Sequence, residues 1–424
     1  PVMFVLDGES HFYATVGLVQ QLSQVNLNSI VPEMIIVGIE NTNRFKDLTP
    51  KSNSQSPFET FLNSELIPFI NDNYNAAPYR ILVGHSLGGL LAINILKNQP
   101  DMFNAYLAIE PSMWFNNEQV LKEAIAKLPQ QKLYNRKLFL GIANTLPKNT
   151  LPNKVSKDNK PETQHYRSIK KLDDFLKKNK IKGLSYTSNF YVNENHNSVV
   201  LLSQYDGLKY LFNYYNSGLT EKDFQDSTAT IVLKLRKHYG IVTNELDYNV
   251  APPEDFINYL ASDALSKKQH SKAEQLYLFN IENYPKSNKA LAAYADFLVV
   301  RKDLERAEKF YTKSLQINED NNIRQKLNNL HRPTYVITAN ELKQFAGQYI
   351  LDLYKITITL ELKDGKLISK VPGQADSEFV AVDKDVFTVK DKQGYTITFH
   401  RSNESITGFT SVQPNGTFKA TKKE

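Results

Sequence analysis

Residues 84–89 (Gly-His-Ser-Leu-Gly-Gly) have the residue types and spacing that nucleophilic catalysis needs. An apolar run at 79–83 precedes them, and a second apolar run at 90–96, typical of a helix, follows. The order strand, Gly-x-Ser-x-Gly, helix predicts a sharp turn that exposes the serine at the end of a sheet. Glycine at 84 and 88 meets the steric demand of such a turn. We therefore interpret Ser86 as a nucleophile.

A serine hydroxyl is a weak nucleophile at neutral pH and needs a base within hydrogen-bond reach. Position in the chain sets aside six of the eight histidines: His11, His85, His238, His270, His331 and His400. His165 begins a predicted helix, and we interpret it as a surface residue. His196 follows a predicted strand at 184–192 and precedes a further helix, which is the loop position that the base requires. The sequence thus predicts His196 as the base.

The group that orients this histidine has three candidates. The usual position, after a predicted strand at 137–143, holds Asn144 in place of an acid. Glu110 ends the strand that follows the nucleophile unit and can present a carboxylate to the same histidine, so it is the first candidate. A Ser-His dyad, with Asn144 or a backbone carbonyl fixing the imidazole, is the second. Glu194 is the third candidate. It ranks last because it lies two residues before His196 on the same loop, and neighbours on one loop seldom orient each other well.

Two backbone N–H groups should stabilise the oxyanion of a tetrahedral intermediate. Leu87, directly after the nucleophile, supplies one, and Gly8, in the turn after the first strand, is the candidate for the other. Asp7 in the same turn is a candidate substrate contact. Trp114, the one tryptophan of the chain, could wall a substrate pocket or serve as a packing residue, and both interpretations stay open.

Six separated motifs resemble the esterase branch of the α/β-hydrolases, which includes esterase D-like enzymes and enterochelin-type siderophore trilactone hydrolases. They lie at 6–8, 41–50, 84–89, 110–114, 143–145 and 196–199. The resemblance covers about residues 1–215 and implies a carboxylester hydrolase without metal or organic cofactor. Some members are described as Ser-His dyads, which suits Asn144. The branch usually has glycine where this chain has Asn197. We expect Arg44 and Asp47 to hold a loop by an ion pair.

Composition and charge exclude several other classes of protein. The 424 residues are 41% hydrophobic and 23% charged, as in globular proteins, and a net charge of +6 with scattered lysines gives nucleic-acid binding no support. The sequence contains no run of 18 apolar residues, so no membrane-spanning helix is predicted. The absence of cysteine excludes a thiolate nucleophile, a thiolate metal site and disulfides. We expect a periplasmic or secreted protein whose signal peptide, with one or two strands, precedes Pro1.

The elements that must position these residues alternate in type along residues 1–215. Predicted strands cover 2–6, 33–40, 79–83, 105–110, 137–143 and 184–192. Predicted helices include 11–23, 58–74, 90–96, 119–126 and 165–177. Continuous apolar strands separated by helices predict an α/β-hydrolase domain with a parallel-dominated sheet and helices on both faces.

A helical segment is predicted after this domain. Residues 216–253 are interpreted as a connector with a helix at 228–239. In the segment 254–331, Lys-Ala-Glu at 272–274 recurs as Arg-Ala-Glu at 306–308. This period of 34 residues resembles the tetratricopeptide repeat. Such repeats predict either a protein partner or a spacer.

A small antiparallel β module is predicted at 334–424. Short alternating runs mark strands at 355–362, 366–371, 379–382, 386–389, 395–400 and 406–412. The module loosely resembles those appended to many bacterial serine hydrolases, and no chemistry is predicted for it.

The predicted function is that of a serine esterase acting through an acyl-enzyme. The candidate substrates are small-molecule or carbohydrate esters, namely siderophore lactones, acylated carbohydrates and short acyl esters. One alternative is a degenerate hydrolase scaffold whose repeats bind a protein partner. Acyl transfer to an alcohol is a weaker alternative.

Overall fold

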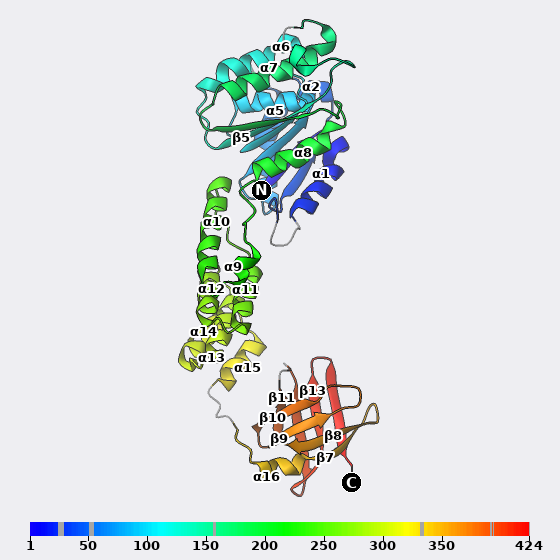
Figure 1. Ribbon diagram of the computed structural model, residues 1–424, viewed down its shortest axis with the longest axis vertical. Helices are drawn as coiled ribbons and strands as arrows, with labels where there is room; N and C mark the ends of the chain where they lie inside the picture. The colour runs from blue at the N-terminus through cyan, green and yellow to red at the C-terminus, as the bar shows by residue number, and fades with distance from the viewer. Residues whose placement is uncertain are drawn as a thin grey trace. The chain divides into compact units, whose positions relative to one another are not determined.

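The computed structural model describes residues 1–23, 29–50, 55–155, 158–330, 335–390, 392 and 394–423. The chain divides into two compact units, Pro1–Phe297 and Leu298–Glu424, and each is described by itself (Figure 1). The predicted boundaries at 331, 334 and 424 lie outside the described residues. Among the residues described, no helix has the length and apolar character needed to cross a bilayer.

The first unit is built on a six-stranded parallel sheet. Its strands are β1 (Val2–Leu6), β2 (Ile35–Ile39), β3 (Arg80–His85), β4 (Ala105–Ile109), β5 (Arg136–Ala143) and β6 (Leu184–Tyr191). Their order in the sheet is β2-β1-β3-β4-β5-β6, and every neighbouring pair is parallel. Parallel neighbours need crossover connections, which place helices on the faces of a sheet.

Helices cover both faces of this sheet, which confirms the predicted fold class (Figure 1). They are α1 (Gly8–Ser23), α2 (Arg44–Leu48), α3 (Pro57–Phe61), α4 (Ile67–Asn73), α5 (Leu87–Asn98), α6 (Phe115–Lys127), α7 (Gln164–Lys178) and α8 (Val199–Leu211). A π-helical turn at Leu62–Leu66 joins α3 to α4, so the predicted helix at 58–74 is continuous but irregular.

The side chains of β1 alternate between two apolar clusters, because successive residues of a strand point to opposite faces. Val2, Phe4 and Leu6 pack with residues of α5, α6 and α7. Met3 and Val5 pack with residues of α1 and α8 on the other face. Since both faces are buried, the strand is apolar throughout, and the carboxyl ends of β1, β3 and β4 meet at one edge of the sheet.

Further helices follow the sheet in the chain. They are α9 (Glu221–Gln225), α10 (Thr230–Leu246), α11 (Glu254–Ser266), α12 (His270–Asn283), α13 (Asn288–Val300), α14 (Leu304–Ile317) and α15 (Asn321–Asn329). Helix α10 extends the predicted helix at 228–239 to Leu246 and buries Val242 and Leu246 in the cluster of α1 and α8. The helix starts at 254 and 288, and at 270 and 304, lie 34 residues apart. The spacing agrees with the predicted period, and the assignment to a repeat family stays a prediction.

The second unit ends in a closed eight-stranded barrel. Its strands are β7 (Gly347–Leu351), β8 (Ile356–Lys363), β9 (Lys366–Lys370), β10 (Ser377–Asp383), β11 (Val386–Val389), β12 (Thr396–Ser402), β13 (Ser405–Gln413) and β14 (Gly416–Lys422). Their order is β10-β11-β12-β13-β14-β7-β8-β9. Each pair of neighbouring strands in this order, and the pair β9 and β10 that closes it, is antiparallel. The sequence did not predict β7 and β14, which pair with each other to close the barrel.

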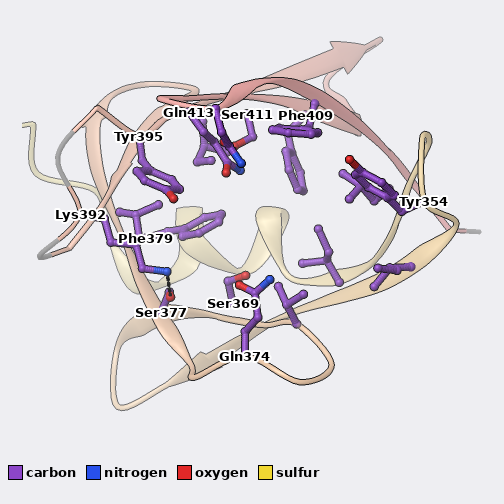
Figure 2. A pocket seen from close by; sticks show the side chains of 18 residues that line it. Tyr354, Ser369, Gln374, Ser377, Phe379, Lys392, Tyr395, Phe409, Ser411 and Gln413 are labelled. Carbon is purple, nitrogen blue, oxygen red and sulfur yellow. Dashed lines mark hydrogen bonds between the residues drawn. The ribbon is translucent and has the colours of Figure 1, made fainter.

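Aromatic side chains fill part of the barrel interior. Phe345, just after the short helix α16 (Ala339–Leu342), packs edge-on against Phe387 and Phe399, with ring centroids 4.8 and 4.7 Å apart. Phe409 joins this cluster at 5.4 Å from Phe399. Beyond Phe409 the interior is hollow and forms a cavity of about 450 Å³ (Figure 2).

Candidate active site

Ser86 lies in a strained turn between β3 and α5. Its φ and ψ are 58° and −113°, a combination that non-glycine residues rarely adopt. Its backbone N–H donates to Ile109 O (3.0 Å), and its own carbonyl accepts from Ser112 N–H (3.0 Å). These bonds to the neighbouring strand and loop hold the turn in a conformation that costs on the order of 1–3 kcal/mol.

The close approach of α5 to β3 explains two of the three glycines of the turn. A Cβ on Gly84 would lie 2.2 Å from Gly88 O, and one on Gly89 would lie 3.0 Å from Pro111 Cα. A Cβ on Gly88 would meet Leu6 Cβ at an ordinary 3.4 Å. The steric prediction therefore holds for Gly84 but is wrong for Gly88, and the second tight position is Gly89.

Two neighbouring strands end in the same strained way. Asp7 follows β1 with φ 54°, and Glu110 follows β4 with φ 45°. Because β1, β3 and β4 are adjacent in the sheet, Asp7, Ser86 and Glu110 lie along one edge. Three adjacent strands thus each end at a non-glycine residue with positive φ. Such a concentration of backbone strain is typical of functional sites.

His196 joins Ser86 to Glu110. Its Nε2 lies 3.0 Å from Ser86 Oγ, and its Nδ1 lies 3.2 Å from Glu110 Oε2. Both contacts are within hydrogen-bond distance, and an imidazole with its proton on Nδ1 can donate to the carboxylate and accept from the hydroxyl at once. The structure thus brings together three side chains that are 110 and 86 residues apart in the chain.

Two side chains, Asn195 and Asn144, fix the loop that carries His196 between β6 and α8. Asn195 Oδ1 accepts from the backbone N–H groups of Asn197 and Ser198, at 2.9 and 3.1 Å. Asn144 Nδ2 donates to Val192 O (3.0 Å), so this side chain ties the loop to β5. Asn197 does not adopt a positive φ, and the loop therefore has no need of the glycine usual in the branch.

His85 contacts the same loop through a hydrogen bond to the backbone of His196. Its Nε2 lies 2.7 Å from His196 O, and the two rings lie 4.6 Å apart. Because a carbonyl oxygen only accepts, Nε2 carries the proton. Burial, with a further contribution from the nearby His196, lowers the pKa of His85 to about 4, so the ring is neutral near pH 7.

Glu110 is completely buried and fully hydrogen-bonded. Its Oε1 accepts from Ala143 N–H (2.6 Å), and its Oε2 faces both His196 and His165. Burial alone would raise the pKa of this carboxyl, but the hydrogen bonds from the two histidines and from Ala143 outweigh it and lower the pKa below its usual value. Glu110 is therefore ionised at neutral pH and can stabilise a charged imidazole.

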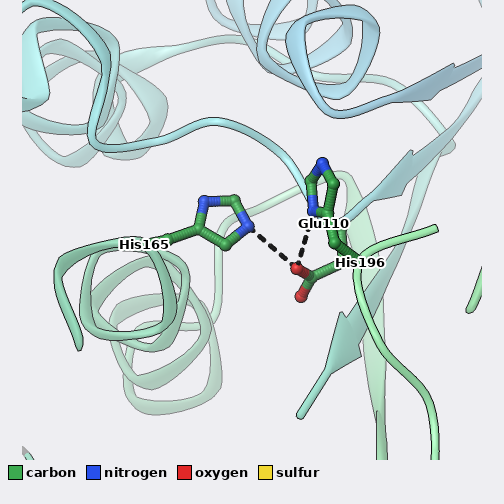
Figure 3. A group of neighbouring side chains, drawn as sticks. All are labelled: Glu110, His165 and His196. Carbon is green, nitrogen blue, oxygen red and sulfur yellow. Dashed lines mark hydrogen bonds and ion pairs between the residues drawn. The ribbon is translucent and has the colours of Figure 1, made fainter. Parts of the chain in front are cut away.

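The sequence interpretation missed His165. Its Nε2 lies 2.8 Å from Glu110 Oε2, closer than His196 Nδ1 (Figure 3). The interpretation as a surface residue is wrong, since this side chain is about one-fifth exposed and contacts the buried carboxylate. Topology contained the signal: α7 crosses from β5 to β6, so its first turn must lie at the sheet edge that holds Ser86 and Glu110.

This cluster of three side chains has the chemistry of a metal site as well. Glu110, His165 and His196 each offer one ligand atom, and these atoms lie within 4.8 Å of one another. Imidazole and carboxylate ligands suit zinc and other first-row transition metals. A metal ion there would replace the proton on His196 Nδ1, so binding it would conflict with the hydrogen bonds of Figure 3.

The two predicted oxyanion donors are the first residues of helices α1 and α5. Leu87 is the first residue of α5, where backbone N–H groups lack partners within the helix. Gly88 Cα lies beside Leu6 and Asp7, which places the turn after β1 next to the start of α5. Gly8 itself packs against β2, since a Cβ there would lie 2.6 Å from Ile39 N. Close packing, and not a positive φ, thus accounts for this glycine.

Asp7, a candidate substrate contact, is already occupied. Arg44 binds its two oxygens at 2.7 and 3.0 Å, and Asn41 Nδ2 donates to one of them (2.7 Å). The Asp7 side chain is 5% exposed. The expected loop-holding ion pair is therefore formed by Arg44 with Asp7. Asp47 instead accepts from the backbone N–H groups of Thr42 and Asn43.

Trp114 begins a row of aromatic side chains near the site, in which Trp114 and Phe45 are exposed and Phe115 is half-buried. The indole is 40% exposed and lies 6.3 Å from the Phe115 ring, which lies 5.7 Å from Phe45.

Ser112, two residues before Trp114, places its hydroxyl 3.2 Å from Ser86 Oγ, a contact that the sequence did not predict. Glu194, the third candidate acid, contributes its backbone: its N–H donates to Tyr191 O (3.2 Å), and its carbonyl accepts from Asn144 N–H (2.9 Å).

Comparison with known proteins relates the first unit to esterases. Residues 1–177 match the family model described as "Putative esterase". The ferri-bacillibactin esterase BesA of Bacillus subtilis is 29% identical over 168 residues, which are 34% of this chain and 58% of that protein. The chain thus spans little more than half of the length of this curated relative.

Two solved structures extend the comparison. An IroE-like serine hydrolase from Shewanella oneidensis is 28% identical with a TM-score of 0.54, covering 66% of this chain and 89% of that one. An uncharacterised protein from Capnocytophaga ochracea shares the fold at 18% identity and a TM-score of 0.53, over 78% of this chain and 91% of that one. Together with the family match, these relatives support the esterase branch of the α/β-hydrolase fold.

Proposed function

We propose that this protein is a serine carboxylester hydrolase that acts through an acyl-enzyme on Ser86. The observation that carries the proposal is the position of His196 between Ser86 and Glu110, at 3.0 and 3.2 Å. This is the order of nucleophile, base and orienting acid that recurs in hydrolases of unrelated folds. The family match and the esterase relatives support the same reaction class.

In the first step of this mechanism, His196 Nε2 takes the proton of Ser86 as Oγ attacks the ester carbonyl. Glu110, ionised and buried, stabilises the imidazolium through Nδ1–H. The N–H groups of Leu87 and of the turn containing Gly8 donate to the oxyanion. Collapse expels the alcohol, which receives the proton from His196, and leaves Ser86 acylated.

The second step reverses the roles. His196, neutral again, takes a proton from water, whose oxygen attacks the acyl carbon. The tetrahedral intermediate uses the same oxyanion donors, and its bond to Ser86 Oγ breaks as His196 returns the proton to Oγ, which releases the acid and regenerates Ser86. Asn144 and His85 act only as positioning residues, since they bind the loop and not the reacting atoms.

The proposed substrate class is a siderophore ester. Support comes from the relatives, among which are the ferri-bacillibactin esterase and a siderophore enterobactin esterase of Emericella nidulans. The rings of Trp114, Phe115 and Phe45 meet edge to face, and the exposed Trp114 and Phe45 offer apolar surface that suits a large aromatic acyl group.

The test compares the wild-type chain with Ser86→Ala on a panel of p-nitrophenyl acyl esters and a ferric catecholate trilactone. We expect hydrolysis of the trilactone by the wild type and a loss of at least about 10³-fold in the variant. A fluorophosphonate should label the wild type once, at Ser86. Absence of both hydrolysis and labelling in folded protein would favour the alternative of a degenerate scaffold that binds partners.

A further inference from the structure

The cavity at the open end of the barrel has the size of a small-molecule site. Its volume is about 450 Å³, within the range of ligand pockets in proteins. Eight-stranded barrels have an interior wide enough either to be filled by side chains or to hold one small ligand. Here both occur, because the cluster around Phe345 fills one part and Phe409 separates it from the hollow part.

The walls of the cavity favour a flat aromatic ligand. Five aromatic side chains line it: Tyr354, Phe379, Tyr395, Phe409 and Phe418. Figure 2 shows Tyr395 and Phe379 on one side of the hollow and Tyr354 on the other. Aromatic rings bind an aromatic guest by offset stacking or edge-to-face contact, which adds to the burial of apolar area.

Two buried hydroxyls face this space from opposite walls. Ser369 on β9 and Ser411 on β13 are 4% and 3% exposed, and both line the cavity. Their strands are four apart in the closed order of eight, so they lie across the barrel from each other, as Figure 2 shows. Ser411 Oγ accepts from Gln413 Nε2 (2.9 Å) and keeps its own proton to donate.

The charge at the rim is positive. Lys392 is the one charged side chain among the described residues that line the cavity. Its Nζ donates to Ser377 Oγ (3.2 Å) and lies 5.6 Å from the centre of the Tyr395 ring. A lysine beside an aromatic wall, with no described carboxylate lining the same space, attracts an anionic group on an aromatic ligand.

We propose that the barrel cavity binds a hydroxylated aromatic carboxylate. In this arrangement the ring lies among the five aromatic side chains, the carboxylate meets Lys392 at the rim, and a ring hydroxyl reaches Ser369 or Ser411. The site is separate from Ser86 and does not depend on its chemistry. A saturated alkyl chain would leave the two buried hydroxyls without partners from the ligand, which is unfavourable for buried polar groups.

The test is a fluorescence titration of the full-length chain with 6-hydroxy-2-naphthoate. Comparison ligands are 2-naphthol, which lacks the carboxylate, and decanoate, which lacks the ring. Lys392→Gln removes the rim charge, and Lys419→Gln, an exposed residue of β14 that does not line the cavity, is the matched control. Ser86→Ala reports whether binding depends on the Ser86 hydroxyl. Ser411→Ala probes the wall.

We expect saturable 1:1 binding that Lys392→Gln weakens at least about tenfold, with a smaller loss in Ser411→Ala. Lys419→Gln and Ser86→Ala should bind as the wild type does, and 2-naphthol should bind at least about tenfold more weakly. Equal affinity in wild type and Lys392→Gln, loss of binding in Ser86→Ala, or tighter binding of decanoate would each overturn the proposal.

Discussion

His165 Nε2 lies 2.8 Å from Glu110 Oε2, the same oxygen that His196 Nδ1 reaches at 3.2 Å. Two histidines therefore share one buried carboxylate oxygen, and only one of them contacts Ser86. A hydrogen bond from His165 lowers the pKa of Glu110 and so keeps it ionised despite burial. His165 also competes with His196 for the same carboxylate oxygen, Glu110 Oε2. His165 is thus positioned to set how strongly Glu110 acts on the base.

Replacing His165 should alter the pH profile as well as the rate. In His165→Leu the carboxylate loses one donor, burial raises the pKa of Glu110, and the acid limb of kcat/KM should shift to higher pH. We expect kcat/KM at neutral pH to fall about tenfold, the size of one charge-assisted hydrogen bond. His165→Gln, whose amide can still donate, should recover most of both effects. A uniform loss in both variants, without any pH shift, would indicate a merely structural role.

The orienting acid can be identified by comparing Glu110→Gln with Asn144→Ala. Glutamine keeps the shape but not the charge, so the imidazolium loses its stabilisation and kcat should fall by about two to four orders of magnitude. Asn144 binds only the loop, through Val192 O, and its loss should cost less than about fivefold. The assay is hydrolysis of a p-nitrophenyl ester. Equal, mild effects in both variants would instead indicate a Ser-His dyad.

Much of the fold and of the site was predictable because it depends on local patterns. Apolar runs buried on both faces mark the parallel strands, and the glycines around Ser86 mark the turn. His196 was predictable from its place after the last strand. Glu110 was one of three candidates, because which strand end faces a histidine loop depends on the spatial order β3-β4-β5, which no local pattern contains.

The misses have physical causes of the same kind. His165 reaches Glu110 only through the crossover of α7, and Ser112 reaches Ser86 only because the loop after β4 folds back over it. The helix predicted at 119–126 lies within α6 as expected, but residues 116–118 before it adopt left-handed conformations that no periodicity reveals. Strands β7 and β14 are short or polar and are fixed by closure of the barrel.

Stability should distinguish the glycines at 84 and 88. A Cβ at position 84 would lie 2.2 Å from a backbone oxygen, so Gly84→Ala should destabilise the first unit by several kcal/mol or prevent folding. In Gly88→Ala the new methyl group meets Leu6 and Asp7 at ordinary contact distances, so the unfolding free energy should change by less than about 1 kcal/mol. Urea unfolding followed by Trp114 fluorescence measures this unit alone, since the chain has one tryptophan. Equal destabilisation by both changes would contradict the steric argument.

The pH dependence of stability should report the neutral state of His85. Folding lowers its pKa to about 4 from the ordinary 6.5, so between these values the unfolded chain binds a proton that the folded chain does not. Stability is full above pH 6.5 and falls as the pH drops toward 4. Between pH 7 and 5 we expect this residue to account for a loss of about 2 kcal/mol. Urea unfolding followed by Trp114 fluorescence measures the unfolding free energy at each pH. The loss of unfolding free energy between pH 7 and 5 should be smaller in His85→Gln than in the wild type, and the same as in the wild type in His400→Gln. If the unfolding free energy of His85→Gln depended on pH as that of the wild type does, the neutral state of His85 in the folded chain would be contradicted.

Metal ions should separate the proposed mechanism from metal-dependent hydrolysis. Zinc bound by Glu110, His165 and His196 Nδ1 would leave the proton of His196 on Nε2, where it can no longer accept from Ser86. Micromolar zinc should therefore inhibit ester hydrolysis, and EDTA should leave the activity of the untreated protein unchanged. His165→Gln removes one ligand but keeps a donor to Glu110, so it should resist zinc at least about tenfold better while remaining active. If EDTA abolished activity and zinc restored it, these three residues would hold a required metal, and attack by Ser86 with His196 as its base would have to be abandoned.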